Sequence, residues 1–124
     1  MNISKESNFW KNKKVFVTGH TGFKGGWLCL FLKSLGANVT GYSLRPITKK
    51  NLFTEGKIYS LIDKSIIADI RNEKKLYKEL KKSNAEIIFH LAAQALVRES
   101  YLQPKETIET NVIGTTNILD CIRK

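Results

Sequence analysis

The chain has 124 residues, 42% of them hydrophobic, which is enough apolar material for one small folded domain and too much for a disordered segment. No run reaches the roughly 18 apolar residues that a membrane-spanning helix needs, and the polar segment Met1–Trp10 lacks the features of a secretory signal, so we expect a cytoplasmic protein without a membrane partner. The net charge of +10 comes from scattered lysines without interleaved aromatic residues, which favours a solvated surface over nucleic-acid binding.

The first half of the chain alternates apolar runs with turns. The run Lys13–Thr18 enters a glycine cluster and predicts a buried parallel strand. The largely apolar segment Gly25–Leu35 is followed by a glycine, a common helix terminator, and predicts a helix. Asn38–Leu44 predicts a second strand. The segment Arg45–Lys64 shows little periodicity and predicts an irregular loop with one helical turn.

The second half continues the alternation. Ser65–Ala68 predicts a third strand, and Asn72 is a good N-cap for a helix whose leucines, Leu76 and Leu80, fall on one face. Ala85–His90 predicts a fourth strand, followed by a loop. Proline suits the first turn of a final helix, in which four apolar residues repeat near a 3.6-residue period. They are Ile108, Val112, Leu119 and Ile122, after Pro104.

The segment Gly19–Gly25 is the most informative part of the sequence, because it joins the first predicted strand to the first predicted helix. Its G-x-x-G-x-x-G spacing matches neither the standard G-x-G-x-x-G fingerprint nor a P-loop. Gly19 would allow a tight turn, Gly22 would let the backbone approach a pyrophosphate, and Gly25 would let helix and strand pack closely. Free amides at the helix start would then face the phosphates. We therefore favour dinucleotide binding over a plain structural turn.

Strands that alternate with helical crossovers predict an α/β fold with a parallel sheet. With the glycine loop after the first strand, this alternation predicts the N-terminal half of a doubly wound Rossmann sheet, with strand order 3-2-1-4. We see no domain boundary, so residues 1–124 form one nucleotide-binding unit. Cys29 and Cys121 form no C-x-x-C pair and show no ligand spacing to a histidine, which predicts buried free thiols and no metal site.

The T-G-x-x-G-x-x-G motif at this position resembles the extended short-chain dehydrogenase/reductase family. Three further stretches match that family in the same order: Ala68–Arg71, His90–Gln94 and Thr110–Thr115. Within the family, the strings G-H-T-G-F-K-G-G-W, G-Y-S-L, A-A-Q-A-L-V-R and S-Y-x-x-P resemble the CDP-glucose 4,6-dehydratases. The resemblance implies a lyase of deoxysugar and polysaccharide biosynthesis that binds NAD tightly, converts CDP-glucose to CDP-4-keto-6-deoxyglucose by internal hydride transfer, and forms a homo-oligomer.

Several residue roles follow from the glycine loop and the resemblance. Asp69 would accept a hydrogen bond from the adenine amino group, with Ile70 beside the ring. Asn111 lies in a helix, where its propensity is poor, so we expect a structural polar partner such as the backbone of the glycine loop. Arg98 and Tyr101 are substrate-side candidates in the loop after the fourth strand, together with Gln94. The candidate cofactor-binding residues are Gly19, Thr21, Gly22, Phe23, Lys24, Gly25, Ser43, Leu44, Arg45, Asp69, Ile70, Leu91, Ala92, Ala93 and Gln94.

The residue that would contact the ribose leaves the choice of cofactor open. An acidic residue about twenty positions beyond the glycines usually binds the ribose 2′-hydroxyl, whereas this chain has Ser43, Leu44 and Arg45 there. Arginine can instead bind a 2′-phosphate. The resemblance predicts NAD, and the local chemistry leaves NADP as the alternative.

Members of the family use a Tyr-x-x-x-Lys pair that follows the fifth strand, and we expect this chain to end before that segment. Two strings match by chance, Tyr77–Lys81 in a crossover helix and Tyr101–Lys105 across a proline. The sequence therefore predicts an incomplete domain that lacks the substrate domain and is inactive alone. The alternatives are another NAD(P)-dependent nucleotide-sugar epimerase or dehydratase, such as a GDP-mannose dehydratase, and a non-catalytic dinucleotide-binding module.

Overall fold

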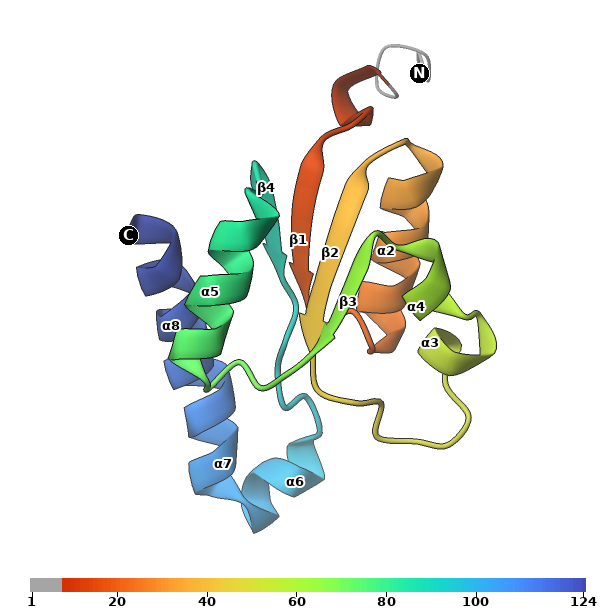
Figure 1. Cartoon of the computed structure of the whole chain (residues 1–124). Coiled ribbons are helices and arrows are strands. Elements are labelled where there is room, and N and C mark those ends of the chain that lie inside the picture. The colour runs from red at the N-terminus through yellow and green to blue at the C-terminus, as the bar shows by residue number, and fades with distance from the viewer. Residues whose placement is uncertain (1–7) are drawn as a thin grey trace.

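A four-stranded parallel sheet forms the centre of the computed structural model, which describes residues 8–124 (Figure 1). The strand order is β3-β2-β1-β4, which confirms the predicted order 3-2-1-4. The chain moves outward from β1 to β3 and then crosses the sheet to place β4 on the other side of β1. This reversal lies beside the glycine loop, where ligands bind in doubly wound sheets. The strands are β1 (Lys14–Thr18), β2 (Asn38–Ser43), β3 (Lys64–Ile67) and β4 (Ile87–His90).

Helices cover both faces of the sheet (Figure 1). On one face lies α2 (Phe23–Ser34), with the short helices α3 (Leu52–Glu55) and α4 (Ile58–Leu61) beside it. On the other face α5 (Glu73–Ser83) packs against α8 (Gly114–Arg123). None of the helices within residues 8–124 is long and apolar enough to cross a membrane.

The core has two halves because side chains alternate between the faces of β1. Val15 and Val17 pack toward α2, whereas Phe16 packs toward α5 and α8, and all three are at most 1% exposed. This strand is buried on both faces, as its continuous apolar run predicted. Cys29 joins the first half and Cys121 the second, and both are buried free thiols, as predicted.

Local signals placed the helix ends well. The side chain of Asn72 caps α5 by accepting a hydrogen bond from the Lys75 amide at 3.1 Å, and Leu76 and Leu80 are buried. Helix α2 begins at Phe23, two residues before the predicted start. It is followed by Gly36 with a φ of +87°, a conformation that favours glycine.

The two irregular segments contain more helix than the sequence indicated. The connection from β2 to β3 forms two short helices, α3 and α4, instead of one helical turn. The Asn51 side chain caps α3 by accepting from the Thr54 amide at 2.8 Å. After β4, residues Val97–Leu102 form α6, so Arg98 and Tyr101 lie on a helix and the prediction of a loop there was wrong.

The final segment is helical after Pro104, as predicted, but it is not one regular α-helix. This segment consists of α7 (Pro104–Ile108), the π-helical turn η1 (Glu109–Ile113) and α8. A π turn adds one residue, and one residue rotates an α-helical face by about 100°. The four residues expected to form the apolar face are each at least half exposed: Ile108, Val112, Leu119 and Ile122. The buried residues of α8 are Gly114, Asn117, Ile118 and Cys121.

Candidate functional site

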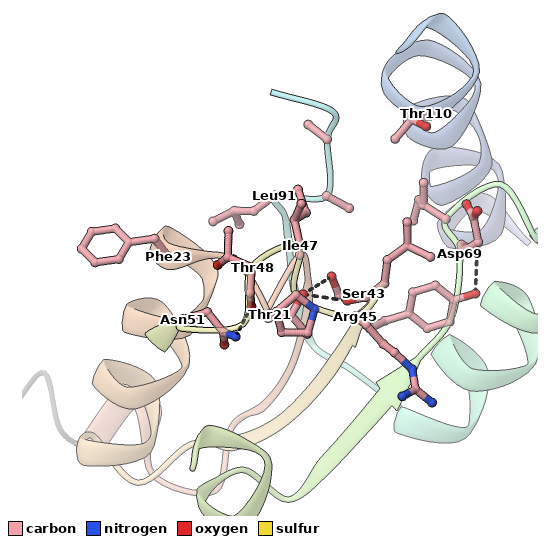
Figure 2. Close-up of a pocket in the computed structure, with 18 of the residues that line it drawn as sticks. Thr21, Phe23, Ser43, Arg45, Ile47, Thr48, Asn51, Asp69, Leu91 and Thr110 are labelled. Atoms are coloured by element: carbon pink, nitrogen blue, oxygen red, sulfur yellow. Dashed lines mark hydrogen bonds between the residues drawn. The ribbon is translucent and has the colours of Figure 1, made fainter. Parts of the chain in front are cut away.

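A cavity of about 500 Å³ opens at the carboxyl ends of the four strands. Figure 2 shows Phe23 at one end of it, Asp69 at the other, and Leu91 between them. Thr110 of η1 approaches from the α7–α8 side. The predicted site residues that line the cavity are Gly19, Thr21, Gly22, Phe23, Ser43, Leu44, Arg45, Asp69, Ile70, Leu91, Ala92 and Ala93.

Five predicted site residues do not line the cavity. Lys24 is exposed on α2, and Gly25 is buried beneath the glycine turn. Gln94 anchors the loop after β4 through backbone contacts described below. Arg98 and Tyr101 lie on α6, where Tyr101 is 83% exposed. The structure therefore brings together the residues at the strand ends but not those of the following helix.

One wall of the cavity was missed by the sequence analysis. It consists of the connection that follows β2, including Pro46, Ile47 and Thr48, and continues to Leu52. This stretch lacks periodicity, so no sequence pattern indicated that it would fold back over the strand ends. Thr110 also lines the cavity but was not predicted as a site residue, although it begins the stretch Thr110–Thr115 that matches the family.

The three glycines of the loop differ in what surrounds them. Gly19 has a φ of +79°, and an added Cβ would lie 2.7 Å from the Leu91 carbonyl carbon. At Gly25 an added Cβ would lie only 2.0 Å from the Gly19 carbonyl oxygen. At Gly22 it would meet only that same oxygen, at 3.4 Å. The tight turn and the close packing agree with the predicted geometry, and Gly22 leaves room on the cavity side.

The N-terminus of α2 provides hydrogen-bond donors beside Gly22. Gly22 is the N-cap and has no side chain, so no side chain caps the first turn. The first amides of an α-helix have no acceptor within the helix and carry the positive end of its dipole. The first turn also contains no acidic residue. These features suit an anionic group such as a phosphate.

His20 holds the glycine loop against β2 and β3. Its ring is fully buried and lies over Gly41, where an added Cβ would be 2.3 Å from ring carbons. Its Nε2 atom hydrogen-bonds the Ser65 hydroxyl at 2.7 Å, and the edge of the ring meets Phe53. Burial lowers the pKa of His20 to about 4, so the ring is neutral at pH 7.

Hydroxyl groups line the cavity at the end of β2. The Thr21 hydroxyl donates to the Leu44 carbonyl at 2.7 Å and lies 2.9 Å from the Ser43 hydroxyl. Its single proton serves the carbonyl, so the Ser43 hydroxyl donates to Thr21. Arg45 follows and lines the cavity near these groups (Figure 2). A ribose would find two neutral hydroxyls and one cation here, and no carboxylate at this strand end.

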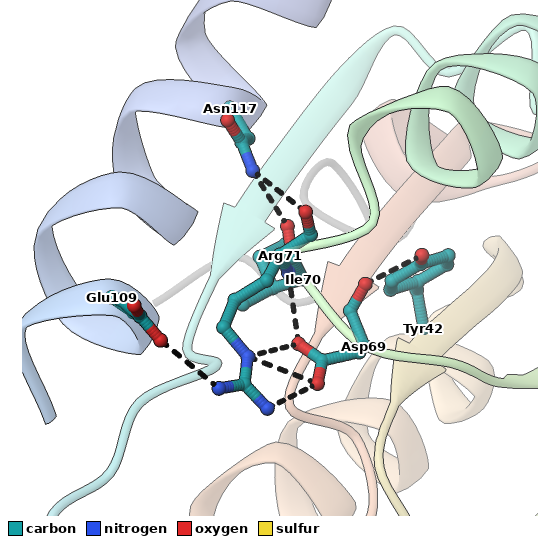
Figure 3. A network of polar contacts seen from close by, with 6 residues as sticks. All are labelled: Tyr42, Asp69, Ile70, Arg71, Glu109 and Asn117. Carbon is teal, nitrogen blue, oxygen red and sulfur yellow. Dashed lines mark hydrogen bonds and ion pairs between the residues drawn. The ribbon is translucent and has the colours of Figure 1, made fainter. Parts of the chain in front are cut away.

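A polar network fixes the segment after β3 (Figure 3). The Asp69 carboxylate accepts from the Arg71 guanidinium at 2.7 to 3.1 Å and from the Arg71 amide at 2.9 Å. Hydrogen bonds from Arg71 hold the pKa of Asp69 below its ordinary value. Arg71 also approaches Glu109 at 3.5 Å, and Asn117 donates to the Ile70 carbonyl at 3.1 Å. The carboxylate therefore stays charged at the edge of the cavity.

Asn111 has a structural role, with a partner other than the expected glycine loop. Its side-chain carbonyl accepts from the Gln94 amide at 2.7 Å, and its side-chain NH₂ donates to the Gln94 carbonyl at 3.0 Å. The Asn111 side chain thus satisfies both the backbone N–H and the backbone carbonyl of Gln94, as the backbone of an adjacent strand does in a sheet. This double contact ties η1 to the loop that carries Leu91–Ala93.

Neither Tyr-x-x-x-Lys string lies at the cavity. Tyr77 and Lys81 lie on α5, where the ammonium donates to the phenol oxygen at 3.1 Å. Tyr101 lies on α6 and Lys105 on α7, so the two residues are not on one continuous helix. The described residues therefore present no such acid–base pair to the cavity.

Comparisons with known sequences show which family the chain is similar to. The sequence model of the family described as GDP-mannose 4,6 dehydratase matches residues 16–124. A CDP-glucose 4,6-dehydratase from Salmonella typhimurium is 49% identical over 119 residues, which cover 96% of this chain and 33% of that protein. The chain spans between a fifth and a third of the length of the curated relatives it matches.

Solved structures of epimerases share the fold. An epimerase from Methanothermobacter thermautotrophicus superposes with a TM-score of 0.78 and 25% identity, over 96% of this chain and 34% of that one. A UDP-glucose 4-epimerase from Brucella ovis in complex with NAD gives 0.75 and 26%, over 90% of this chain and 32% of that one. The matched part of each enzyme is about a third of its chain.

Proposed function

Because the chain belongs to the GDP-mannose 4,6 dehydratase family, we propose that it forms the NAD-binding part of a dehydratase that converts CDP-glucose to CDP-4-keto-6-deoxyglucose. The observation that carries the choice of substrate is the 49% identity to a CDP-glucose 4,6-dehydratase across nearly the whole chain. The dinucleotide site is supported independently by the cavity at the strand ends and the uncapped start of α2.

Each part of the cavity suits one part of a dinucleotide. The amides at the start of α2 would hold the pyrophosphate beside Gly22, because they point outward and lack acceptors. Asp69 would accept from the adenine amino group, and Ile70 would pack against the ring. Leu91 and Ala92 would form the apolar wall along the path to the nicotinamide. NAD held there would supply hydride acceptance, which oxidises the sugar at C4 and so makes the C5 proton acidic, and hydride return after the loss of water.

The ribose end of the cavity supports NAD, with NADP as the testable alternative. Thr21 and Ser43 offer neutral hydroxyls to a ribose 2′-hydroxyl, whereas Arg45 offers a cation to a 2′-phosphate. Titration of the chain with each dinucleotide separates these cases. We expect NAD to bind at least as tightly as NADP, and Arg45→Ala to leave NAD affinity nearly unchanged. NADP affinity far above NAD affinity, lost in the variant, would overturn the choice of cofactor.

We place the acid–base residues of the reaction outside these 124 residues. The support is the position of both Tyr-x-x-x-Lys strings away from the cavity. The activity, the nucleotide-sugar partner and the homo-oligomeric state are therefore proposed for the complete enzyme. Product analysis of the complete enzyme with CDP-glucose, GDP-mannose and UDP-glucose tests the substrate, and turnover of UDP-glucose alone would support an epimerase instead.

A further inference from the structure

A line of hydrogen-bonded side chains runs from β1 through the end of β4 to the start of α8, with His90 at its centre. The Thr18 hydroxyl lies 2.6 Å from Nδ1 of His90, and Nε2 of His90 lies 3.0 Å from the Thr115 hydroxyl. The Thr115 hydroxyl in turn lies 2.6 Å from the backbone carbonyl oxygen of Asn111. These residues come from the end of β1, the end of β4 and the start of α8, which are far apart in sequence.

Counting donors and acceptors fixes the direction of every bond in this line. The Thr18 hydroxyl oxygen accepts from the Ala92 amide at 3.1 Å and from the Leu91 amide at 3.0 Å, an amide that it shares with the Thr18 backbone carbonyl at 3.1 Å, so both of its lone pairs are occupied. Its proton must therefore be donated to Nδ1 of His90, which carries no hydrogen.

The other end of the line gives the same tautomer. The single proton of the Thr115 hydroxyl is donated to the Asn111 carbonyl, an acceptor without protons. The Thr115 oxygen can then only accept from His90, so Nε2 carries the hydrogen. The neutral Nε2–H form of His90 is thus the one form that satisfies all these groups. Burial lowers the pKa of His90, which agrees with a neutral ring.

We propose that His90, held as its neutral Nε2–H tautomer, is a positioning residue that fixes the apolar wall of the cofactor site against η1. The inference rests on the proposed dinucleotide binding. His90 acts through other residues: Thr18 holds the amides of Leu91 and Ala92, which line the cavity, and Thr115 connects the ring to η1, whose Thr110 lines the cavity from the other side.

Two neighbouring threonines of α8 provide a matched test. Thr115→Val removes the acceptor for His90 together with a bond to the carbonyl four residues earlier. Thr116→Val removes the same kind of bond, to the Val112 carbonyl at 2.9 Å, but Thr116 is exposed on the helix and the structure gives it no bond to His90. Thr115→Ser retains the hydroxyl and serves as the conservative rescue.

The tautomer is read from the ¹⁵N shifts of histidine-labelled chain by magic-angle-spinning NMR, which tolerates association. The sequence has two histidines, so His20→Gln assigns the signals. We expect the Nε2–H form of His90 in the unmodified chain and in both variants, because Thr18 still donates to Nδ1, and a changed Nε2 shift only in Thr115→Val, where Nε2–H has lost its acceptor. NAD affinity should fall about fivefold in Thr115→Val alone, as for one lost hydrogen bond, and recover in Thr115→Ser.

Each contrary result has a distinct meaning. An Nδ1–H or charged His90 at pH 7.5 in the unmodified chain would overturn the inference. Equal losses of NAD affinity in Thr115→Val and Thr116→Val would overturn the positioning role, because they would reflect the helix alone. Failure of the unmodified chain to bind NAD or NADP would refute the proposed function and the positioning role, while the tautomer itself is measured without any ligand.

Discussion

Two glycines of the loop, three residues apart, should differ in what an added side chain disrupts: dinucleotide binding at Gly22 and stability at Gly25. Gly22 has ordinary extended backbone and space on the cavity side, whereas Gly25 is pressed against the Gly19 carbonyl. We expect Gly22→Val to cost only about 1 kcal/mol of unfolding free energy, as a poor N-cap does, and to abolish dinucleotide binding. Gly25→Ala should lose about 3 kcal/mol or more, because backbone must move.

Urea unfolding and NAD titration of both variants separate these effects. A Gly22→Val protein that is folded and still binds NAD with unchanged affinity would show that no phosphate approaches this glycine. A Gly25→Ala protein as stable as the unmodified chain would contradict the close contact.

His20 should make the stability of the chain fall in mild acid. The pKa of His20 is about 4 in the folded protein and 6.5 as the ordinary value, so the unfolded chain binds more protons between these limits. The stabilisation is complete above pH 6.5 and is lost as the pH falls toward 4. The free energy of unfolding should drop by about 2 kcal/mol from pH 7 to pH 5, before most carboxylates titrate.

A glutamine at this position gives the control. His20→Gln keeps a polar group near Ser65 and removes the titration, so its unfolding free energy should depend less on pH over the same range. His90 contributes a smaller slope of the same sign, because burial also lowers the pKa of His90. Equal slopes in the variant and the unmodified chain would show that His20 is not the titrating group.

At the scale of elements, the sequence predicted what local chemistry determines. The cap Asn72 and the terminator Gly36 depend on residues within one turn, and the structure confirms both. The exposure of Ile108, Val112, Leu119 and Ile122 was not predictable, because a 3.6-residue period identifies an apolar face but not what covers it. The contacts that place η1, such as Asn111 with Gln94, join residues 17 positions apart across a loop, and spacing alone does not reveal them.

The pairing of Asn111 with Gln94 should stabilise the whole final segment. In Asn111→Asp, a carboxylate oxygen replaces the NH₂ group and faces the Gln94 carbonyl, so one hydrogen bond becomes a repulsion. We expect a loss of about 2 to 3 kcal/mol of unfolding free energy at pH 7. Differential scanning calorimetry measures this, with Thr116→Val as the control on the same helical segment. Unfolding temperatures equal to that of the unmodified chain would mean that Gln94 is held by other contacts.

At the scale of the molecule, the order of the strands and the position of the cavity were predictable. Both follow from alternation of elements and from the glycine loop, which mark the topology and its reversal. The wall formed by Pro46–Leu52 was not predictable, because its position depends on packing against strand ends rather than on a repeating pattern. Long-range side-chain partners, including those of His20 and His90, were unpredictable for the same reason.

The 124-residue chain should bind a dinucleotide without turning over CDP-glucose, and it should self-associate. No Tyr-x-x-x-Lys pair of the described residues faces the cavity, so proton transfer at the sugar lacks its acid and base. Within residues 8–124, β4 pairs only with β1 and is half-buried throughout, which leaves a sheet edge available for pairing. Sedimentation velocity and an assay for the 4-keto product test both points. Turnover above background, or a monodisperse monomer in sedimentation velocity, would contradict them.

The contact between the His20 ring and Gly41 restricts the order in which these two positions can evolve. A methyl group at Gly41 would overlap ring carbons that Ser65 and Phe53 hold in place. Replacing His20 first by a smaller residue opens that space, after which alanine at Gly41 becomes tolerable. The reverse order passes through a misfolded intermediate. Related proteins that retain the histidine are therefore expected to retain the glycine, whereas proteins with the glycine can have a smaller residue in place of the histidine.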